Sequence, residues 1–535
     1  MARRSRSNTT VAGGTALLLL FALCCGRALW GEEGGSWRST AFSSPSWQGS
    51  QRREAFARGR GASYKPRTLG LTGAGHLRHV STRRAAEDEA ESPEEPAGTG
   101  TVVGTAASVT KGMVGSGILS LAAGVAAFTR SPEGLSLSVL MLIAFTSVAA
   151  YSFQLVAWVS AETGSKDFGE AWSKSVGERF TWVPRFAVIV ISVVSCIIYA
   201  MLLGDLLASI LRGVLSVVSS GGALGAVRDV LLPWCQKGPV LVVLASTVLL
   251  PLCLQENFAN LSLTSILGLV AAAYLACFVV YRFLDGSYVR GGQFFAAAPF
   301  KPLSLVPAQG LSDIVNLRSL VLMSNFGMAY MNHGMAPPTY QELMPADSAH
   351  GDAEAAKVAK LRKYRLVSLL SFGGAGVLCI SVMVAGFMTF GPNSAGNLLA
   401  NYANTDFAAA FARACVMFSV LCGFPLNFAI LRVELNGIMK QRGQELSRST
   451  LRLFTIGLLS FFVVAALLLG DIGQVQAVCG SILGSFIVYT APAIMARSMR
   501  LKRGGGRRFQ AVAEVGLIAV GAVVSVVGLT LSLRK

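Results

Sequence analysis

The stretch TKGMVGSGILS (residues 110–120) lies in one of the most apolar parts of the chain, yet it holds a lysine and three glycines. Glycine is a poor helix former and a lysine charge is costly in lipid, so neither residue suits an ordinary membrane helix. Small residues recur here at every fourth position, as in a seam for close helix packing: Gly112, Ser116 and Ser120. Gly115 and Gly117 fall on other faces. They predict a helix that unwinds and exposes backbone N–H and C=O groups to a polar ligand.

A second interrupted segment, FGMAYMNHGMAPP (326–338), carries Gly327, Gly334, Pro337 and Pro338 in an otherwise apolar run. An isolated kinked helix is one interpretation. Two interruptions five apolar segments apart favour another, because secondary transporters bind substrate carboxylates at the positive ends of broken helices near the bilayer midplane. The chemistry expected of these residues is therefore binding by backbone groups.

A few ionisable residues lie inside apolar segments, and Lys111 is the deepest of them. It lies nine residues in, roughly 13 Å along a helix, where a side chain reaches the headgroups with difficulty. His333 titrates near neutral pH, or it is a satisfied histidine that bonds a carbonyl freed by Pro337. Asp205 either caps the end of its segment or pairs with a cation. Two residues lie within about two turns of a segment end, where long side chains reach the headgroups: Arg413 and Glu514.

The elements that position these residues follow from composition. The chain has 535 residues, of which 53% are hydrophobic and 14% are charged. Soluble domains carry about 25% charged residues, so this chain has too little polar surface for a soluble fold. Apolar runs of about 20 residues, long enough to cross a bilayer as helices, predict an all-α polytopic membrane protein. Eleven such segments cover residues 102–128, 135–160, 184–210, 239–254, 260–281, 319–341, 366–390, 407–431, 452–470, 474–496 and 511–533.

The net charge of +18 gathers in the first 90 residues or so and in short loops. That pattern is typical of topology signals and not of a nucleic-acid-binding face. Four alternate loops hold 20 Lys and Arg residues, whereas the opposite loops up to residue 301 hold seven. The positive-inside rule therefore puts the start of the membrane domain on the cytosol-like side. The ten cysteines form no CxxC pair or Cys/His cluster, so we expect no metal site and no cofactor.

The N-terminal part differs from the rest of the chain. Residues 1–86 begin with a basic stretch and a short apolar run, Ala16–Cys25, and continue as a basic, Ser-rich segment. This order is similar to a secretory signal followed by a transit peptide, as in proteins sent to plastids with extra membranes; a disordered cytosolic tail is the alternative. Residues 87–100, which include EDEAESPEEP, predict an acidic linker to the membrane domain, residues 101–535. If Ala16–Cys25 stayed as a span, every loop would change sides, so we expect it to be removed or not to span.

Several motifs resemble the amino acid/auxin permease family of secondary transporters over most of residues 101–500. They are VGSGILSL (114–121), IYAMLLGDLL (198–207), LPLCLQENFANLSLTS (250–265), NHGMAPPTYQEL (332–343) and GDIGQVQAVCGSILGSFIVYTAPAIM (470–495). The resemblance implies a LeuT-like inverted repeat, helices 1–5 and 6–10, with an eleventh helix outside it. It also implies an amino acid substrate held at broken helices 1 and 6.

The resemblance assigns roles to particular residues. The implied substrate-binding residues are Gly115, Ser116, Gly117, Met328, Asn332 and His333. The implied proton-transfer or gating residues are His333, Asp205 and Glu342. Sodium-coupled relatives have an asparagine and a threonine where this sequence has Lys111 and Gly423. The side chains of Lys111 and Gly423 offer no oxygen ligand to a hard cation such as Na⁺. The resemblance therefore implies coupling to H⁺ and not to Na⁺, with Lys111 at the vacated ion position.

Alternatives remain open at this point. A sensor on the same fold, or a sodium-coupled transporter of neutral amino acids, would share these motifs. An intramembrane enzyme is not expected, because the sequence has no HExxH motif and no facing aspartate pair. The leader suggests a plastid envelope, with a vacuolar or other endomembrane or the plasma membrane as alternatives. The expected partners are an amino acid, a coupling ion and the lipid bilayer.

Overall fold

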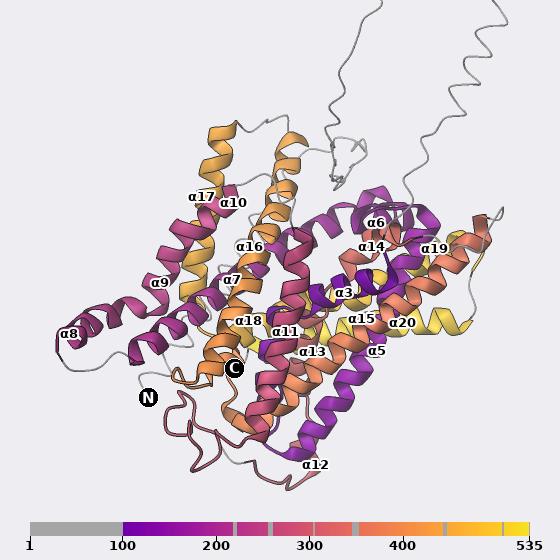
Figure 1. Ribbon diagram of the computed structural model, residues 1–535. Helices are drawn as coiled ribbons and strands as arrows, with labels where there is room; N and C mark the ends of the chain where they lie inside the picture. Colours follow the sequence, from indigo (N-terminus) through magenta and orange to yellow (C-terminus); the bar gives the residue numbers. More distant parts are fainter. Residues whose placement is uncertain are drawn as a thin grey trace, which may run out of the picture.

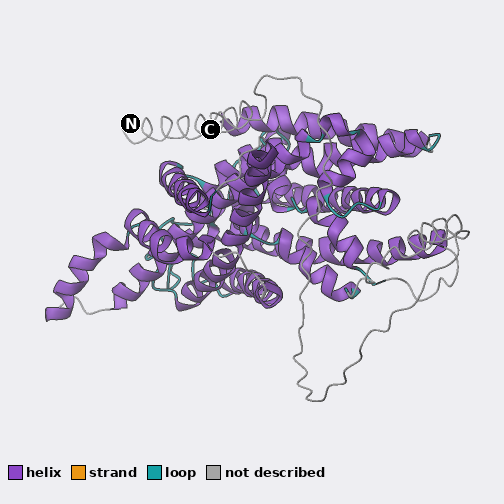
Figure 2. Cartoon of the chain, turned by 90° about the horizontal axis from the view of Figure 1, so that it is seen from above, coloured by secondary structure: helices purple, strands orange, loops and turns teal. Residues whose placement is uncertain are grey.

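The computed structural model describes residues 100–217, 222–254, 261–302, 305–344, 353–441, 447–505 and 508–533. Within these ranges the chain is all-helical, and Figure 2 shows helices joined by loops, with no strand in the described part. The all-α membrane fold expected from composition is confirmed. The predicted leader, residues 1–86, and the linker up to residue 99 lie outside the described residues.

Nine helices of the described ranges are long and apolar enough to cross a membrane, or ten with one bent pair. The nine run over α5 (Pro132–Thr163), α7 (Trp182–Val217), α9 to α10 (Lys237–Leu254), α11 (Leu261–Leu284), α15 (Ala353–Phe390), α16 (Phe407–Gln441), α17 (Arg448–Leu468), α18 to α19 (Ile472–Lys502) and α20 to α21 (Arg508–Leu533). Each matches one predicted segment. The first predicted segment is the bent pair, and the sixth is divided into two helices that are each too short to span.

Shorter elements join the long helices. They include α6 (Phe168–Val176), α8 (Gly222–Leu231), η3 (Leu232–Cys235) and α12 (Leu311–Ile314). Figure 1 shows α8 at the edge of the molecule, whereas α3, α13 and α18 lie toward the middle of the bundle. The elements that carry the two interruptions are therefore surrounded by the long helices.

Local sequence explains where several helices begin and end. Ser131 precedes α5 and accepts a hydrogen bond from the Gly134 N–H, while Pro132 occupies the first turn, where a missing N–H does no harm. The helix ends before Gly164, whose φ of 62° is a left-handed conformation that suits glycine. Asp471 caps α18 (Ile472–Cys479) in the same way, because its carboxylate accepts from a backbone N–H of the first turn.

The first predicted span is broken near its middle. α3 (Val102–Met113) is followed by η1 (Ser116–Ser120), which continues into α4 (Leu121–Ala126), and the two parts are bent by 46°. The unwound residues are Val114 and Gly115, so the break begins slightly before the Gly115–Gly117 stretch predicted from the sequence. The small residues at every fourth position therefore lie on both sides of a break and do not form one continuous seam.

The sixth predicted span is broken as well. α13 (Ser319–Ala329) ends before an unwound segment, Tyr330–Asn332, and η5 (His333–Met335) then leads into α14 (Ala336–Glu342). The two prolines of the motif lie in the first turn of α14, where a helix tolerates proline because the missing N–H has no partner there. They begin the second half-helix, and the break itself falls before them.

The two broken spans pack against each other at glycines. A methyl group placed on Gly117 would lie 2.7 Å from the Cα atom of Ala329, and one placed on Gly112 would lie 2.6 Å from the Nδ2 atom of Asn332. Both distances are shorter than van der Waals contact, so no larger residue fits without movement of the backbone or of the amide. Glycine is required here because two segments of backbone approach closely.

Ion pairs to one nearly buried carboxylate tie the helices together at the end of the bundle that carries the basic loops. Glu162 of α5 is nearly buried and pairs with Lys357 of α15 at 2.6 Å, and it also pairs with Arg503, which follows α19 (Ala491–Lys502). Three separate spans are therefore joined at a single carboxylate.

A second cluster joins the loops at the opposite end. Asp406, which is fully buried, accepts hydrogen bonds from the guanidinium of Arg282 at 2.6 and 2.9 Å and from the hydroxyl of Tyr288 at 3.0 Å. Arg282 lies at the end of α11, and Asp406 directly precedes α16. We call Arg282, Tyr288 and Asp406 the Asp406 cluster.

Two residues expected at the bilayer surface are buried instead, and those expectations were wrong. Arg413 is 1% exposed and donates to the carbonyl oxygens of Leu399 at 3.0 Å and Tyr402 at 2.6 Å. Glu514 is also 1% exposed and pairs with Arg500. Partners contributed by other segments hold each charge inside the protein, and sequence position alone does not reveal them.

Candidate functional site

The candidate site lies where the two breaks meet. η1 begins at Ser116, and the residue before it, Gly115, has no side chain that could cap the first turn. The first N–H groups of a helix and its last C=O groups lack partners within that helix, and they carry partial positive and negative charge. Gly117, in the first turn of η1, lies against Ala329, the last residue of α13. A positive helix end and a negative helix end are therefore in contact at the two breaks.

Tyr199 of α7 lies beside the first break, and the sequence reasoning did not single it out. A methyl group placed on Gly115 would lie 3.9 Å from its hydroxyl oxygen, and one placed on Gly423 of α16 would lie 3.1 Å from its ring. Tyr199 thus separates the first broken span from α16. Tyr199 belongs to the motif IYAMLLGDLL, which resembles the permease family, but a tyrosine in an apolar run does not by itself indicate a functional site.

The predicted residues of the sixth span have different surroundings. Asn332 donates from Nδ2 to the carbonyl oxygen of Val109 in α3 at 3.0 Å. The backbone nitrogen of Met328 lies beside Gly480, at 3.2 Å from a methyl group placed there. Asn332 and Met328 therefore contact two different neighbours of the break, the first span and η8 (Gly480–Thr490).

His333 is fully buried and faces α5. Its Nε2 atom lies 2.9 Å from the hydroxyl of Ser152 and 3.2 Å from the carbonyl oxygen of Ala149. The alternative interpretation expected His333 to bond a carbonyl freed by Pro337. The carbonyl that it approaches is that of Ala149 in α5, so the expected partner was wrong. The Nδ1 atom of His333 has no hydrogen-bond partner among the described residues.

Lys111 belongs to α3, in the first span, and its side chain lies toward α11 and α16. A methyl group placed on Gly268 of α11 would lie 2.9 Å from Cε of Lys111 and 3.1 Å from the hydroxyl of Ser419 in α16. Gly268 therefore leaves the room that the lysine chain occupies. The helix α16 faces Lys111 with Ser419, whereas Gly423, one turn further on, faces Tyr199.

The other two predicted gating residues lie away from the breaks. Asp205 of α7 pairs with Lys237 at the start of α9 at 3.1 Å, which is the cation pairing expected as one alternative. Glu342 ends α14 with an exposed side chain, and its backbone carbonyl accepts the Gly100 N–H at 2.8 Å. These contacts connect neighbouring helices, and no residue of either break takes part in them.

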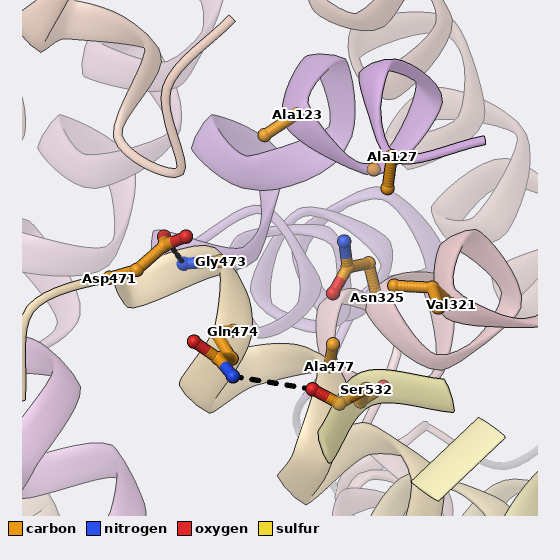
Figure 3. Close-up of a pocket in the computed structure, with 10 residues that line it drawn as sticks. Ala123, Ala127, Val321, Asn325, Asp471, Gly473, Gln474, Ala477 and Ser532 are labelled. Carbon is orange, nitrogen blue, oxygen red and sulfur yellow. Dashed lines mark hydrogen bonds between the residues drawn. The ribbon is translucent and has the colours of Figure 1, made fainter. Parts of the chain in front are cut away.

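A small pocket lies away from the breaks, between α4, α13, α18 and α21 (Leu529–Leu533). Figure 3 shows Asn325, Asp471 and Gln474 around it, with the amide of Gln474 bonded to the carbonyl oxygen of Ser532 at 3.3 Å. The pocket offers about 20 Å³ of space to the centre of a water molecule, and one water needs roughly 10–15 Å³ on this measure. It therefore has room for one or two waters and not for an amino acid.

Gln476, two residues further along α18, is a polar residue that the sequence reasoning missed. Its side chain is fully buried, and neither Nε2 nor Oε1 has a hydrogen-bond partner in the described part of the chain. Gln476 is not among the charged residues of the spans, because a glutamine side chain is neutral. A search for neutral amides in the GQVQAVCG stretch would have found it.

Residues 98–533 match a family model described as transmembrane amino acid transporter protein. Vacuolar amino acid transporter 5 of Schizosaccharomyces pombe is 24% identical over 312 residues, which cover 55% of this chain and 66% of the relative, slightly less than two thirds. Sodium-coupled neutral amino acid transporter 7 of Danio rerio is 21% identical over 392 residues, 71% of this chain and 75% of the relative. The relatives' names thus include both vacuolar and sodium-coupled transporters of amino acids.

Two solved structures are similar in outline. MhsT in complex with L-phenylalanine matches at 11% identity and a TM-score of 0.47, over 80% of this chain and 98% of that one. Mhp1 in a closed conformation with bromovinylhydantoin bound matches at 12% identity and a TM-score of 0.45, over 82% and 91%. At these scores the likeness carries no argument about function.

Proposed function

The chain belongs to the family of transmembrane amino acid transporter proteins, and from that premise we propose that it is a secondary active transporter of amino acids. One observation carries the proposal: the first turn of η1, at Gly117, lies against the end of α13, at Ala329. A free amino acid carries one carboxylate and one ammonium on the same carbon atom. The adjacent positive and negative helix ends match these two charges.

The substrate in this proposal is held by backbone groups of Gly115, Ser116 and Gly117, and the unwound part of the sixth span, near Met328–His333, completes the site. Backbone binding recognises the part that all amino acids share. The side chain of the substrate would then lie toward α7, α16 and α18, so these helices set the preference among amino acids.

We further propose that transport is coupled to H⁺ and does not require Na⁺. The lysine at position 111 supports this proposal, because it brings a cation and no oxygen ligand to the place where a hard cation would need oxygens. No hydrogen bond or ion pair links Lys111 to another described residue, and an ammonium without a partner is costly at such a depth, which makes Lys111 a candidate for the coupled proton. The names of several relatives, which specify sodium coupling, favour the alternative of Na⁺-coupled transport of neutral amino acids.

The location of the protein is a separate proposal. The basic, Ser-rich leader favours a plastid envelope, whereas the vacuolar relatives favour another endomembrane. A fluorescent fusion at the C-terminus, imaged with markers for both membranes, distinguishes these locations.

Uptake into proteoliposomes tests the function. Full-length protein is reconstituted, and labelled amino acids are offered under an inward H⁺ gradient or an inward Na⁺ gradient, each without the other. We expect saturable uptake with the H⁺ gradient alone. Uptake that requires Na⁺ and ignores the pH difference would overturn the coupling, and absence of uptake of any amino acid in both conditions would overturn transport itself.

A further inference from the structure

We propose that Gln476 determines substrate specificity, and that its amide recognises amino acids whose side chains both donate and accept hydrogen bonds. The inference rests on the proposed transport function and names a side-chain class for the same site. Three features of Gln476 support it: its side chain is buried, its amide has no hydrogen-bond partner among the described residues, and it lies on the face of α18 that packs against the sixth span.

The first step is the state of the amide. Gln476 is 0% exposed, and its donor and its acceptor both lack partners among the described residues. A buried polar atom without a partner destabilises a protein, and such atoms are rare in native proteins. Gln474, two residues earlier and on another face of the same helix, has its Nε2 atom bonded to the carbonyl oxygen of Ser532. The unpaired state is therefore particular to Gln476 and is not general to the amides of α18.

The second step is the position of the residue. Gly473, Gln476 and Gly480 are spaced by three and four residues, so they lie on one face of the helix. A methyl group placed on Gly480 would overlap the carbonyl oxygen of Ser324 and lie 3.2 Å from the backbone nitrogen of Met328, both in α13. A methyl group placed on Gly473 would lie 3.1 Å from Cα of Gly396 and 4.0 Å from Cβ of Ala123 in α4. The face of α18 that carries Gln476 therefore packs against the sixth span and lies near the first.

The third step is the depth of that position relative to the breaks. α18 contacts η1, the 3₁₀ turn that follows the first break, and it also contacts α7, which carries Tyr199. Gln476 lies one helical turn before Gly480, the residue directly after α18 that packs against Ser324 and Met328. A substrate held by the backbone at the two breaks would therefore extend its side chain into the region that α7 and α18 border.

The chemistry then follows from what an amide can pair with. A carboxamide has two N–H donors and one oxygen acceptor, so a substrate hydroxyl or carboxamide can satisfy both kinds of atom. An apolar side chain of the same size leaves both atoms of Gln476 unpaired. Sites with buried hydrogen-bonding groups discriminate strongly against analogues that lack the partner, and this discrimination provides the selectivity.

Competition between near-isosteric amino acids tests the proposal. Uptake of glutamine and methionine, and of threonine and valine, is measured with full-length wild type, with Gln476→Leu and with the matched control Gln474→Leu. We expect wild type to favour the polar member of each pair. We expect Gln476→Leu to lower kcat/KM for the polar member about 10- to 100-fold and to change the apolar member less than about 3-fold. Gln474→Leu should change both members alike.

Other outcomes overturn the proposal. A wild type without preference within either pair contradicts it, and so does a Gln476→Leu variant that loses both members equally or neither. If Gln476→Leu fails to fold, as judged by gel filtration in detergent, Gln476→Met replaces the amide with a side chain of similar length and decides the question by the same ratio. A wild type that carries no amino acid at all refutes transport, which is distinct from carrying amino acids without discriminating between the pairs.

Discussion

The side-chain amide of Asn332 donates a 3.0 Å hydrogen bond to the carbonyl oxygen of Val109. The bond joins the unwound part of the sixth span to α3, about one turn before the first break. Together with the contact between Gly117 and Ala329, it links the two broken spans on both sides of the candidate site. Asn332, expected as a substrate ligand, therefore also has a structural partner, and a rearrangement of either broken span will be felt by the other.

The contact at Gly117 gives the first prediction. Gly117→Val should abolish uptake and lower stability by about 1–3 kcal/mol or more, because the new atoms would meet the backbone of Ala329, which cannot turn aside as a side chain can. Initial uptake rate and the melting temperature in detergent measure the two effects. Gly373→Ala in α15 is the control, since a methyl group there meets no described atom within 4 Å. Normal uptake by Gly117→Val would contradict the site.

A second prediction concerns Lys111. If this residue carries the coupled proton, Lys111→Gln should lose accumulation driven by a pH gradient while retaining exchange of labelled for unlabelled amino acid across the membrane. Gly268→Ala should weaken the same driven uptake, because its methyl group would lie 2.9 Å from the lysine chain. Lys301→Gln, an exposed lysine in a loop, is the charge-matched control. Equal loss of driven uptake and exchange in Lys111→Gln would show that the residue is structural.

The Asp406 cluster supplies a third prediction. Asp406→Asn removes one of the two carboxylate partners of the largely buried Arg282 guanidinium, and Asp285 remains as the other. Removing one partner of a buried pair typically costs about 3–5 kcal/mol, and the remaining pair with Asp285 reduces this cost. We expect a melting temperature several degrees lower in detergent. Asp229→Asn, at an exposed position of α8, should leave the melting temperature unchanged. A melting temperature of Asp406→Asn equal to wild type would refute a stabilising role for the cluster.

A fourth prediction concerns pH. Burial acts to raise the pKa of Asp285, but hydrogen bonds from the Ser287 backbone N–H and from Arg282 outweigh it, so the pKa lies below its ordinary value of 3.8. A lowered pKa stabilises the folded state above the unfolded pKa, and this contribution is lost as pH falls through the folded pKa. Melting temperature should therefore fall more steeply below about pH 4 in wild type than in Asp285→Asn. Parallel curves would contradict the prediction.

Topology provides a fifth prediction. The sequon Asn260–Leu261–Ser262 falls on the cytosol-like side in the orientation expected from the basic loops. No glycan should be added there when the protein is expressed in a cell with a glycosylating secretory pathway, as checked by a glycosidase gel shift. A sequon placed in the loop at residues 391–406 should accept a glycan and serves as the positive control. The reverse result would invert the orientation.

Particular residues show what the sequence could and could not predict. Gly115 and Pro337 located both breaks to within a few residues, because glycine and proline act through the local backbone. Arg413 was misplaced because its partners, the carbonyls of Leu399 and Tyr402, come from a loop whose folding no local rule describes. Gln476 was overlooked because its unpaired state depends on what surrounds it in three dimensions and not on its type.

The contact between Gly117 and Ala329 has a consequence for the synthesis of the protein. The two residues are about 210 positions apart in the chain. At about 5–20 residues per second, a ribosome needs about 10–40 s to make the sixth span after the first. The first span therefore makes its contact at Gly117 only after the sixth span has been synthesised, and until then the unwound residues Val114 and Gly115 lack this neighbour.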